Sequence, residues 1–427
     1  MATWQKVKLA DCVNLLAGFP FKSQQFTDKP DDLPLVKGEN VSQGCILWDI
    51  SKRWPALDWD KMAKFHLLPG DVVIAMDRPW IPAGLKWSFI RTGDPKALLV
   101  QRCARLRSSN ARLDQNFLRF VIGSPGFEGY VKPITTGVNV PHISGQQILD
   151  YEFMLPPLPE QRRIAGILCA YDELMENSQR RIRILEAMAR ALYREWFVQF
   201  RFPGHEKLYS SPSGRGRGEG AQLVSSLLGD IPQGWEVRTL GEIAEDMRRN
   251  VPKGILEEPK PYVGLEHIPR RSLALDAWET ATELGSNKLE FKKGEVLFGK
   301  IRPYFHKVSV APFDGLCSAD TIVIRSRRPD HYAVVVACVS SDAFVAEASA
   351  TANGAKMPRA NWDVLEKYQV VIPKGKVAEK FSALFADIIA QQQALIFQIQ
   401  NLRRTRDLLL PRLLSGQVEL STAEVSA

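Results

Sequence analysis

The stretch LPEQRRIAGILCAYDELMENSQRRIRILEAMARALYREWFVQF, residues 158–200, predicts the main architectural element of the chain. Its apolar residues step alternately by four and three positions, which is the 3.5-residue period of a supercoiled helix. Pro159 and Glu160 suit a first helical turn, and Phe202-Pro203-Gly204 suits its end. We expect a rod of about forty residues, roughly 60 Å long. The seam positions are Ile164, Leu168, Tyr171, Met175, Ser178, Ile182, Leu185, Ala189, Leu192 and Trp196.

A second helical series repeats the first one 217 positions downstream. It predicts a helix from near Val377 to Leu414, with Gly416 as its stop signal and Pro411 ending or kinking its last turn. Gln392 and Arg406 interrupt this seam. Two such seams favour a supercoiled helix pair, although each helix could instead serve the core of its own domain. The apolar seam positions are Phe381, Phe385, Ile388, Leu395, Ile399, Leu402, Leu409 and Leu413.

The chain also repeats itself outside the helices. WQKVKL at residues 4–9 matches WEVRTL at 235–240, and PLVKGENV at 34–41 matches PYVGLEHI at 261–268. The pair Arg78-Pro79 recurs as Arg302-Pro303, and Gly137, Pro141 and Pro156 recur as Gly354, Pro358 and Pro373. The offset falls from 231 to 217 along the chain, as small deletions in the second copy would produce. We therefore expect two related globular domains.

Short apolar runs within each copy indicate a mixed α/β domain. We expect strands at residues 71–74, 98–100, 295–298 and 321–324, and short helices at 114–122 and 331–340. Between the copies, SSPSGRGRGEG at 210–220 predicts a flexible linker because it cannot bury a core. The expected order is a first domain at 1–155, a long helix at 156–204, a linker at 205–231, a second domain at 232–373 and a long helix at 374–420.

The composition narrows the class of protein. No apolar run reaches the 18 or more residues of a membrane span, and the first residues lack the apolar stretch of a signal peptide, so we expect a cytoplasmic protein. Lys and Arg outnumber Asp and Glu by 56 to 48, and a net charge of +8 is compatible with a DNA partner. The six cysteines are scattered without a CxxC pair, which indicates reduced thiols.

The sequence lacks the common catalytic and metal-binding motifs. It contains neither a GxxxxGK[ST] phosphate loop nor the methyltransferase pattern of Asp or Asn, two prolines and an aromatic residue. The six histidines show no metal-ligand spacing. We therefore expect neither catalytic residues nor a metal site. Two alternatives stay open: a DNA methyltransferase or nuclease with a site assembled from scattered residues, and a coiled-coil adaptor that does not bind DNA.

Three motifs resemble those of the specificity subunit of type I restriction–modification systems. They are LPPLPEQRRI at residues 155–164, LLGDIPQGW at 227–235 and LPRLLSG at 410–416. The resemblance covers essentially the whole chain and includes the tandem repeat. The second copy departs from the pattern at IPKGK, residues 372–376, which lacks the full PPLPEQ motif.

The resemblance implies an α/β (α+β) fold, in which two target recognition domains are separated by a long antiparallel two-helix coiled coil. Each domain would read one half of a bipartite double-stranded DNA site. The helices would hold the domains apart and dock two methyltransferase subunits, and nuclease/translocase subunits could join the complex. No cofactor is expected in this chain, because S-adenosylmethionine, ATP and Mg would bind partner subunits. A rod of about 60 Å spans roughly 17 base pairs, enough for two half-sites and a gap.

The candidate DNA contacts are donors and aromatic side chains in loops of the two copies. Arginine, lysine, asparagine and threonine can bind phosphates or base edges, and aromatic rings can wedge against sugars or bases. Arg78 and Arg302 recur at equal positions, which favours phosphate contact or a structural role, since readers of different sequences should vary where they touch bases. The candidates are Lys22, Arg78, Trp80, Lys86, Thr135, Thr136, Asn139, Lys300, Arg302, Tyr304, His306, Asn353, Lys356 and Arg359.

Overall fold

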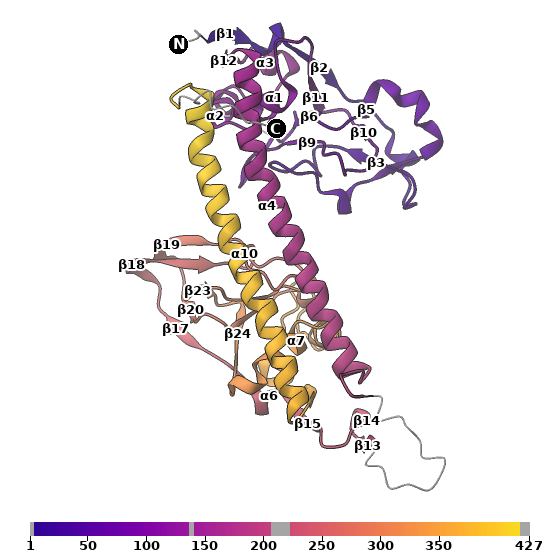
Figure 1. Ribbon diagram of the computed structural model, residues 1–427, viewed down its shortest axis with the longest axis vertical. Coiled ribbons are helices and arrows are strands. Elements are labelled where there is room, and N and C mark those ends of the chain that lie inside the picture. The colour runs from indigo at the N-terminus through magenta and orange to yellow at the C-terminus, as the bar shows by residue number, and fades with distance from the viewer. Residues whose placement is uncertain (1–3, 136–140, 206–222, 419–427) are drawn as a thin grey trace. The chain divides into compact units, whose positions relative to one another are not determined.

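A computed structural model describes residues 4–135, 141–205 and 223–418 of the chain (Figure 1). The chain divides into two compact units. The first unit comprises Met1–Glu173 with Leu402–Ala427, and the second comprises Leu174–Asn401. The boundaries fall inside the two long helices, so each unit contains one globular domain and a part of each helix.

Both predicted long helices are present. Helix α4 spans Leu158–Tyr193 and continues as a π-helical turn at Arg194–Val198, and α10 spans Lys376–Leu414. Pro411 was expected to end or kink the second helix slightly early. It does not end the helix, because α10 continues to Leu414. A proline in the last turn removes only one hydrogen bond. Gly416 follows in the left-handed conformation (φ +71°), which is the conformation of a glycine after a helix end.

Among the described residues, the globular part of the first unit contains two four-stranded sheets and three short α-helices. One sheet has the order β2-β11-β6-β9 and the other β4-β3-β10-β5, while β1 pairs with β12 and β7 with β8. The strands are β1 Gln5–Lys8, β2 Val13–Ala17, β3 Leu33–Val36, β4 Arg53–Trp54, β5 His66–Leu67, β6 Val72–Ala75, β7 Trp80–Ile81, β8 Gly84–Leu85, β9 Trp87–Phe89, β10 Ala97–Leu99, β11 Cys103–Ser108 and β12 Glu152–Leu155. The helices are α1 Gln115–Ile122, α2 Pro125–Ile134 and α3 Gly145–Leu149.

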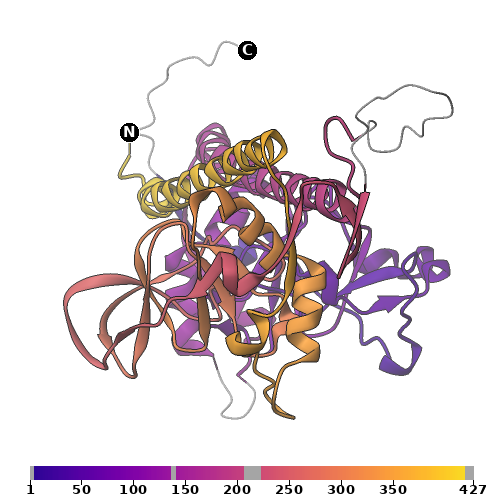
Figure 2. The same cartoon turned by 90° about the horizontal axis from the view of Figure 1, so that it is seen from below.

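The second unit repeats this plan with longer strands. Its sheets have the orders β16-β24-β21-β22 and β17-β20-β23-β18-β19, and β15 pairs with β25. The ribbon β18–β19 extends from the rest of this unit in both views (Figures 1 and 2). The strands are β15 Glu236–Thr239, β16 Ala244–Asp246, β17 Arg249–Val251, β18 Gly254–Val263, β19 Glu279–Leu284, β20 Lys288–Phe291, β21 Val296–Gly299, β22 Val308–Val310, β23 Gly315–Ser318, β24 Thr321–Ser326 and β25 Gln369–Ile372. The helices are α6 Leu240–Ile243, α7 Tyr332–Val339, α8 Asp342–Ala350 and α9 Trp362–Leu365.

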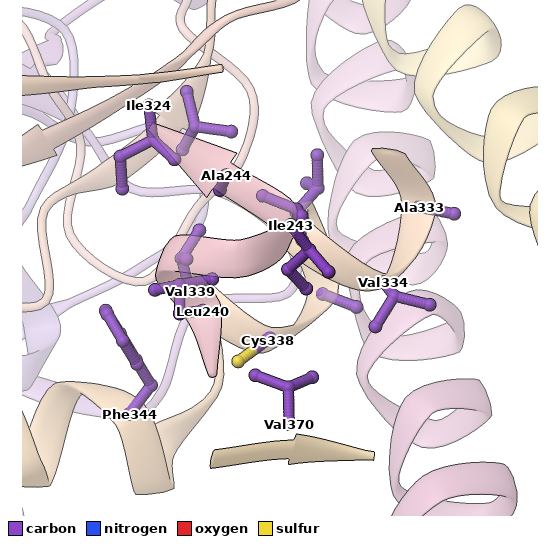
Figure 3. Close-up of a cluster of buried hydrophobic side chains, with 14 of the residues drawn as sticks. Leu240, Ile243, Ala244, Ile324, Ala333, Val334, Cys338, Val339, Phe344 and Val370 are labelled. Atoms are coloured by element: carbon purple, nitrogen blue, oxygen red, sulfur yellow. The ribbon is translucent and has the colours of Figure 1, made fainter. Parts of the chain in front are cut away.

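The predicted strands and short helices of both domains are confirmed to within a few residues. The core of the second domain gathers side chains of α6, α7 and α8 against β24 and β25, with Leu240, Ile243 and Phe344 among them (Figure 3). One expectation differs in part: Leu223–Ser226 (β13) and Gly229–Pro232 (β14) form a hairpin in the segment assigned to the linker. The SSPSGRGRGEG stretch itself lies outside the described residues.

The two helices pair within each unit, and they also complete the domain cores. In the first unit, Ile164 and Leu168 of α4 share one apolar cluster with Leu410 and Leu413 of α10. In the second unit, the ring of Trp196 lies 5.7 Å from that of Phe381. The start of one helix therefore pairs with the end of the other, which is the antiparallel arrangement. None of the predicted seam residues is exposed.

The two polar breaks in the α10 seam have different surroundings. Arg406 forms an ion pair with Asp172 of α4 at 2.8 Å. Gln392 is buried, and within the described residues no acceptor lies within hydrogen-bond distance of its Nε2. The Arg406 guanidinium thus has a carboxylate partner on α4, whereas Nε2 of Gln392 has no acceptor among the described residues.

Within the described residues, no single helix is long and apolar enough to span a membrane. Pro329–Val339 and Asp342–Ala350 satisfy the length and composition criteria only as a pair bent by 66°. The α7 part of this pair is buried in the core of the second domain.

Candidate nucleic-acid interface

A tight turn follows β6 in the first unit, and we call residues 76–79 the first arginine turn. Arg78 has a left-handed backbone (φ +44°), and its N–H donates to the carbonyl of Pro141 at 2.7 Å. The neighbouring Asp77 accepts a hydrogen bond from Arg102 at 2.6 Å. The Arg78 side chain is exposed. The fold therefore holds the backbone of this residue firmly and leaves its guanidinium facing solvent.

The second arginine turn, residues 300–303, repeats this geometry after β21. Arg302 has φ +50°, and its N–H donates to the carbonyl of Pro358 at 2.8 Å. A left-handed conformation at a non-glycine residue costs about 1–3 kcal/mol and persists only where the surroundings impose it. The recurrence of the Arg-Pro pair thus has a structural cause in the backbone. A phosphate contact by either side chain stays a prediction.

A short hairpin lies beside the second arginine turn. The backbones of Asn353 and Arg359 exchange hydrogen bonds of 3.0 and 2.8 Å, and the Arg359 guanidinium lies 3.3 Å from Asp320. Lys356, at the hairpin tip, is exposed, and its carbonyl accepts from Arg302 at 3.4 Å. The structure therefore brings together the predicted contacts Lys300, Arg302, Tyr304, Asn353, Lys356 and Arg359.

Three basic residues missed at the sequence level adjoin this cluster. The Arg270 guanidinium stacks on the ring of Phe305 at 4.1 Å. The Arg271 N–H donates to the carbonyl of His306 at 2.8 Å, and Lys307 follows directly. The two consecutive arginines at 270 and 271 could have been noticed in the sequence as a basic pair. Only the fold shows that they lie beside residues 302–306.

The first unit brings fewer of its predicted contacts together. Trp80 donates from its indole nitrogen to the Thr135 hydroxyl at 3.2 Å, which joins the first arginine turn to the end of α2. Lys22 is exposed on a separate loop. Thr136 and Asn139 lie outside the described residues.

Two predicted DNA contacts are buried, so the structure contradicts a direct role for them. The Lys86 side chain is turned inward with the residue 9% exposed, and its ammonium donates to the carbonyl of Gly38. His306 is 6% exposed, and its Nε2 lies 2.9 Å from the carbonyl of Ser340. Both residues lie in loops, where polar side chains are usually exposed. A single buried polar residue in a loop produces no periodic pattern in the sequence, so its burial could not be predicted.

The described residues contain no group of three or more His, Cys, Asp or Glu side chains able to hold a metal ion. Burial raises the pKa of Cys103 and Cys338 to about 12, so both thiols are protonated at neutral pH and are poor nucleophiles. In each unit, the surface around the arginine turn offers hydrogen-bond donors and aromatic rings, which is chemistry suited to binding a polyanion.

Comparison with known proteins relates the chain to one family. The type I restriction modification DNA specificity domain matches residues 1–187. The chain is 25% identical over 318 residues to the type I restriction enzyme MjaIX specificity subunit of Methanocaldococcus jannaschii, covering 71% of this chain and 69% of that protein. It is 32% identical over 174 residues to the EcoAI specificity subunit of Escherichia coli, covering 41% and 28%. The S subunit of a type I restriction–modification system from M. genitalium has a similar fold, with a TM-score of 0.57 and 14% identity, over 98% of this chain and 97% of that one.

Two related domains, each built on parts of the same two long helices, define a tandem-domain protein, and the described loops of each domain carry exposed basic side chains. The chain is similar to the specificity subunits of type I restriction–modification systems, and its residues 1–187 match the DNA specificity domain of that family. The resemblance drawn from the three sequence motifs is confirmed, as is the mixed fold with two repeated domains and paired helices.

Proposed function

We propose that this chain is the non-catalytic subunit that selects the DNA site of a type I restriction–modification complex. The observation that supports the proposal most directly is the repeated arginine turn. Each domain presents an arginine in the same strained backbone conformation, held by an equivalent hydrogen bond to a proline carbonyl. Two similar surfaces with different side chains suit two different half-sites.

The proposed DNA contacts divide into two kinds. Arg78 and Arg302, being common to both domains, would bind phosphates and set the register of each domain. Residues that differ between the copies would read bases, and in the second domain these include Asn353, Lys356 and Arg359. The net charge of +8 adds a favourable long-range term.

The helices would dock two methyltransferase subunits and set the gap between half-sites. Large apolar side chains are exposed along both helices, which is typical of protein-binding surfaces. They are Leu174, Ile184 and Met188 on α4, and Leu384, Phe397 and Leu408 on α10. S-adenosylmethionine, ATP and Mg would bind the methyltransferase and nuclease/translocase subunits rather than this chain, and the assembled complex would act in the cytoplasm.

A domain exchange tests the proposal. The full chain is produced with its methyltransferase subunits, and the methylated positions of the host genome are mapped. Replacing residues 1–150 by the corresponding region of a relative should change one half of the methylated site and leave the other half intact. A hybrid that altered both halves, or a native complex that methylated no bipartite site, would contradict the proposal.

An insertion tests the part of the proposal that concerns spacing. Four residues added near Asn177 lengthen α4 by about 6 Å, close to two base pairs, while nearly keeping the rotational phase. The preferred gap should grow by about one or two base pairs with both half-sites unchanged. The original gap in the methylation map would show that the helix does not set the spacing.

A further inference from the structure

Each copy contains one lysine whose ammonium faces inward and holds a neighbouring loop. In the first unit, Lys86 donates from Nζ to the carbonyl of Gly38. In the second, Lys307 donates from Nζ to the carbonyl of Leu265. The two lysines are equivalent, because the Lys86 carbonyl accepts from Ala75 at 3.0 Å and the Lys307 carbonyl accepts from Gly299 at 2.9 Å. The repeat seen in the sequence did not show that Lys86 and Lys307 occupy equivalent positions.

The loops held by the lysines share a backbone design and differ in side chains. They are residues 37–40 after β3 and residues 264–267 after β18. The Lys37 N–H donates to the Asn40 side-chain oxygen at 2.8 Å, and the Gly264 N–H donates to Nδ1 of His267 at 3.0 Å. The loops therefore have a common shape on which different residues can be presented.

Each lysine also adjoins the arginine turn of its own domain. The Lys86 N–H donates to the carbonyl of Pro79 at 2.6 Å, directly after Arg78. Lys307 lies two residues after the short helix Pro303–Phe305, whose N-cap residue is Arg302. One residue thus connects two surface loops, with its backbone at the arginine turn and its ammonium on the other loop.

Stability alone does not explain these partly buried ammonium groups. Burial lowers the pKa of Lys86 and of Lys307, because desolvation disfavours the charged form. Within the described residues neither ammonium has a carboxylate within 4.0 Å, so a backbone carbonyl is its partner. An apolar residue of similar length would fill the same space without this desolvation cost.

We propose that Lys86 and Lys307 are positioning residues, which fix the loops 37–40 and 264–267 against the arginine turns and so set the shape of each DNA-reading surface. This inference rests on the proposed function. The lysines act on sequence discrimination through the loops that they hold, without touching the DNA. Each lysine serves only its own half-site, since each bond lies within one domain.

The test measures discrimination at each half-site separately. The full chain is assembled with its methyltransferase subunits, and its affinity is measured for the mapped site and for duplexes altered in one half, at fixed salt. Lys86→Met should reduce discrimination at the first half-site by about tenfold and leave the second unchanged, and Lys307→Met should do the reverse. Lys64→Met and Lys253→Met, which change exposed lysines, are the matched controls and should alter neither.

Three results would overturn the inference. If the wild type is specific and both methionine variants discriminate equally well, the shape of the loops does not depend on the lysines. An equal loss of affinity for all duplexes with a reduced salt dependence would mark the lysines as phosphate contacts. A wild-type complex without any preferred site would remove the proposed function and this inference together. Thermal melting of each variant identifies misfolding. If Lys86→Met misfolds, Lys86→Arg, which keeps a hydrogen-bond donor in a larger group, should show a partial loss of discrimination.

Discussion

The two units attach their globular domains to the long helices by different polar contacts. In the first unit, the Gln161 amide of α4 bonds to the N–H of Asp114 and to the carbonyls of Arg112 and Pro156. Asp172 of α4 also pairs with Arg119 of the domain and with Arg406 of α10.

In the second unit, one buried carboxylate of α4 makes the corresponding attachment. Glu186 is 4% exposed and accepts hydrogen bonds from the Ser272 hydroxyl and from the N–H groups of Leu273 and Ala274. Backbone bonds that define the domain fold recur in both copies, whereas these attachments do not. The two domains thus share a fold and differ in how they are attached to the helices.

The largest effect is expected at the ion pairs of the first unit. Asp172→Ala leaves Arg119 and Arg406 without their shared carboxylate and should cost about 3 kcal/mol. Hydrogen exchange should show the greatest loss of protection in β6 and β11, with smaller changes in β21 and β24. Asp407→Ala removes an exposed carboxylate from the same arginine and serves as the control. Equal loss in both units would contradict separate attachment.

A smaller effect is expected at the attachment of the second unit. Glu186→Gln keeps the shape and one oxygen acceptor but loses the charge, which should cost about 1–2 kcal/mol. The loss should appear in the free energy of unfolding reported by β21 and β24. Asp387→Asn alters an exposed carboxylate of α10 in the same unit and should have little effect. A stability change confined to the first unit would refute the comparison.

Two buried glutamines offer a third test, because their replacement by leucine should change the free energy of unfolding in opposite directions. Gln392→Leu replaces an amide whose Nε2 lacks an acceptor among the described residues, and it should stabilise the chain by about 1 kcal/mol. Gln161→Leu removes three hydrogen bonds and should destabilise it by a larger amount. Urea unfolding of the two variants measures both effects. Destabilisation by Gln392→Leu would indicate that its amide specifies the helix register.

The smallest effect is a pH dependence confined to the second unit. Burial lowers the pKa of His306 below its ordinary value of 6.5, with Arg271 and Arg190 also opposing protonation and Asp342 favouring it. The unfolded chain takes up the proton first, so stability is fully present above about pH 6.5 and decreases as pH falls below it. His306→Gln should reduce this dependence in thermal melts between pH 7 and 5, and His331, whose pKa is also lowered by burial, accounts for what remains. The equivalent position in the first unit is Leu85, which cannot titrate; unchanged pH dependence in the variant would exclude His306 as the cause.

Much of the fold could be predicted from the sequence, because its strongest signals are periodic or repeated. The heptad spacing predicted α4 and α10, and the matched Trp, Gly and Pro positions predicted two related domains. The periodic pattern did not show that the end of α10 completes the core of the first domain, since a seam residue such as Leu413 has the same spacing whether it faces a helix or a domain.

The candidate interface could be predicted less completely. Arg302, Lys356 and Arg359 were selected in separate loops, and the structure brings these loops together. Lys86 and His306 were selected wrongly, because a lysine or histidine in a loop is usually exposed and only tertiary contacts reveal the exceptions. The basic residues 270 and 271 were missed because the first copy has no matching pair.

The first unit draws on both ends of the chain, which has a consequence for synthesis on the ribosome. Its core includes Leu410 and Leu413, and a Cβ added to Gly416 would meet the ring of Trp4 at 3.4 Å. The domain formed by residues 4–155 therefore cannot bury its core fully until residues 410–416 have been translated. The second unit, by contrast, has all its residues available once residue 401 has emerged. A premature stop codon near residue 402 should therefore damage the domain formed by residues 4–155 more than the domain formed by residues 232–373.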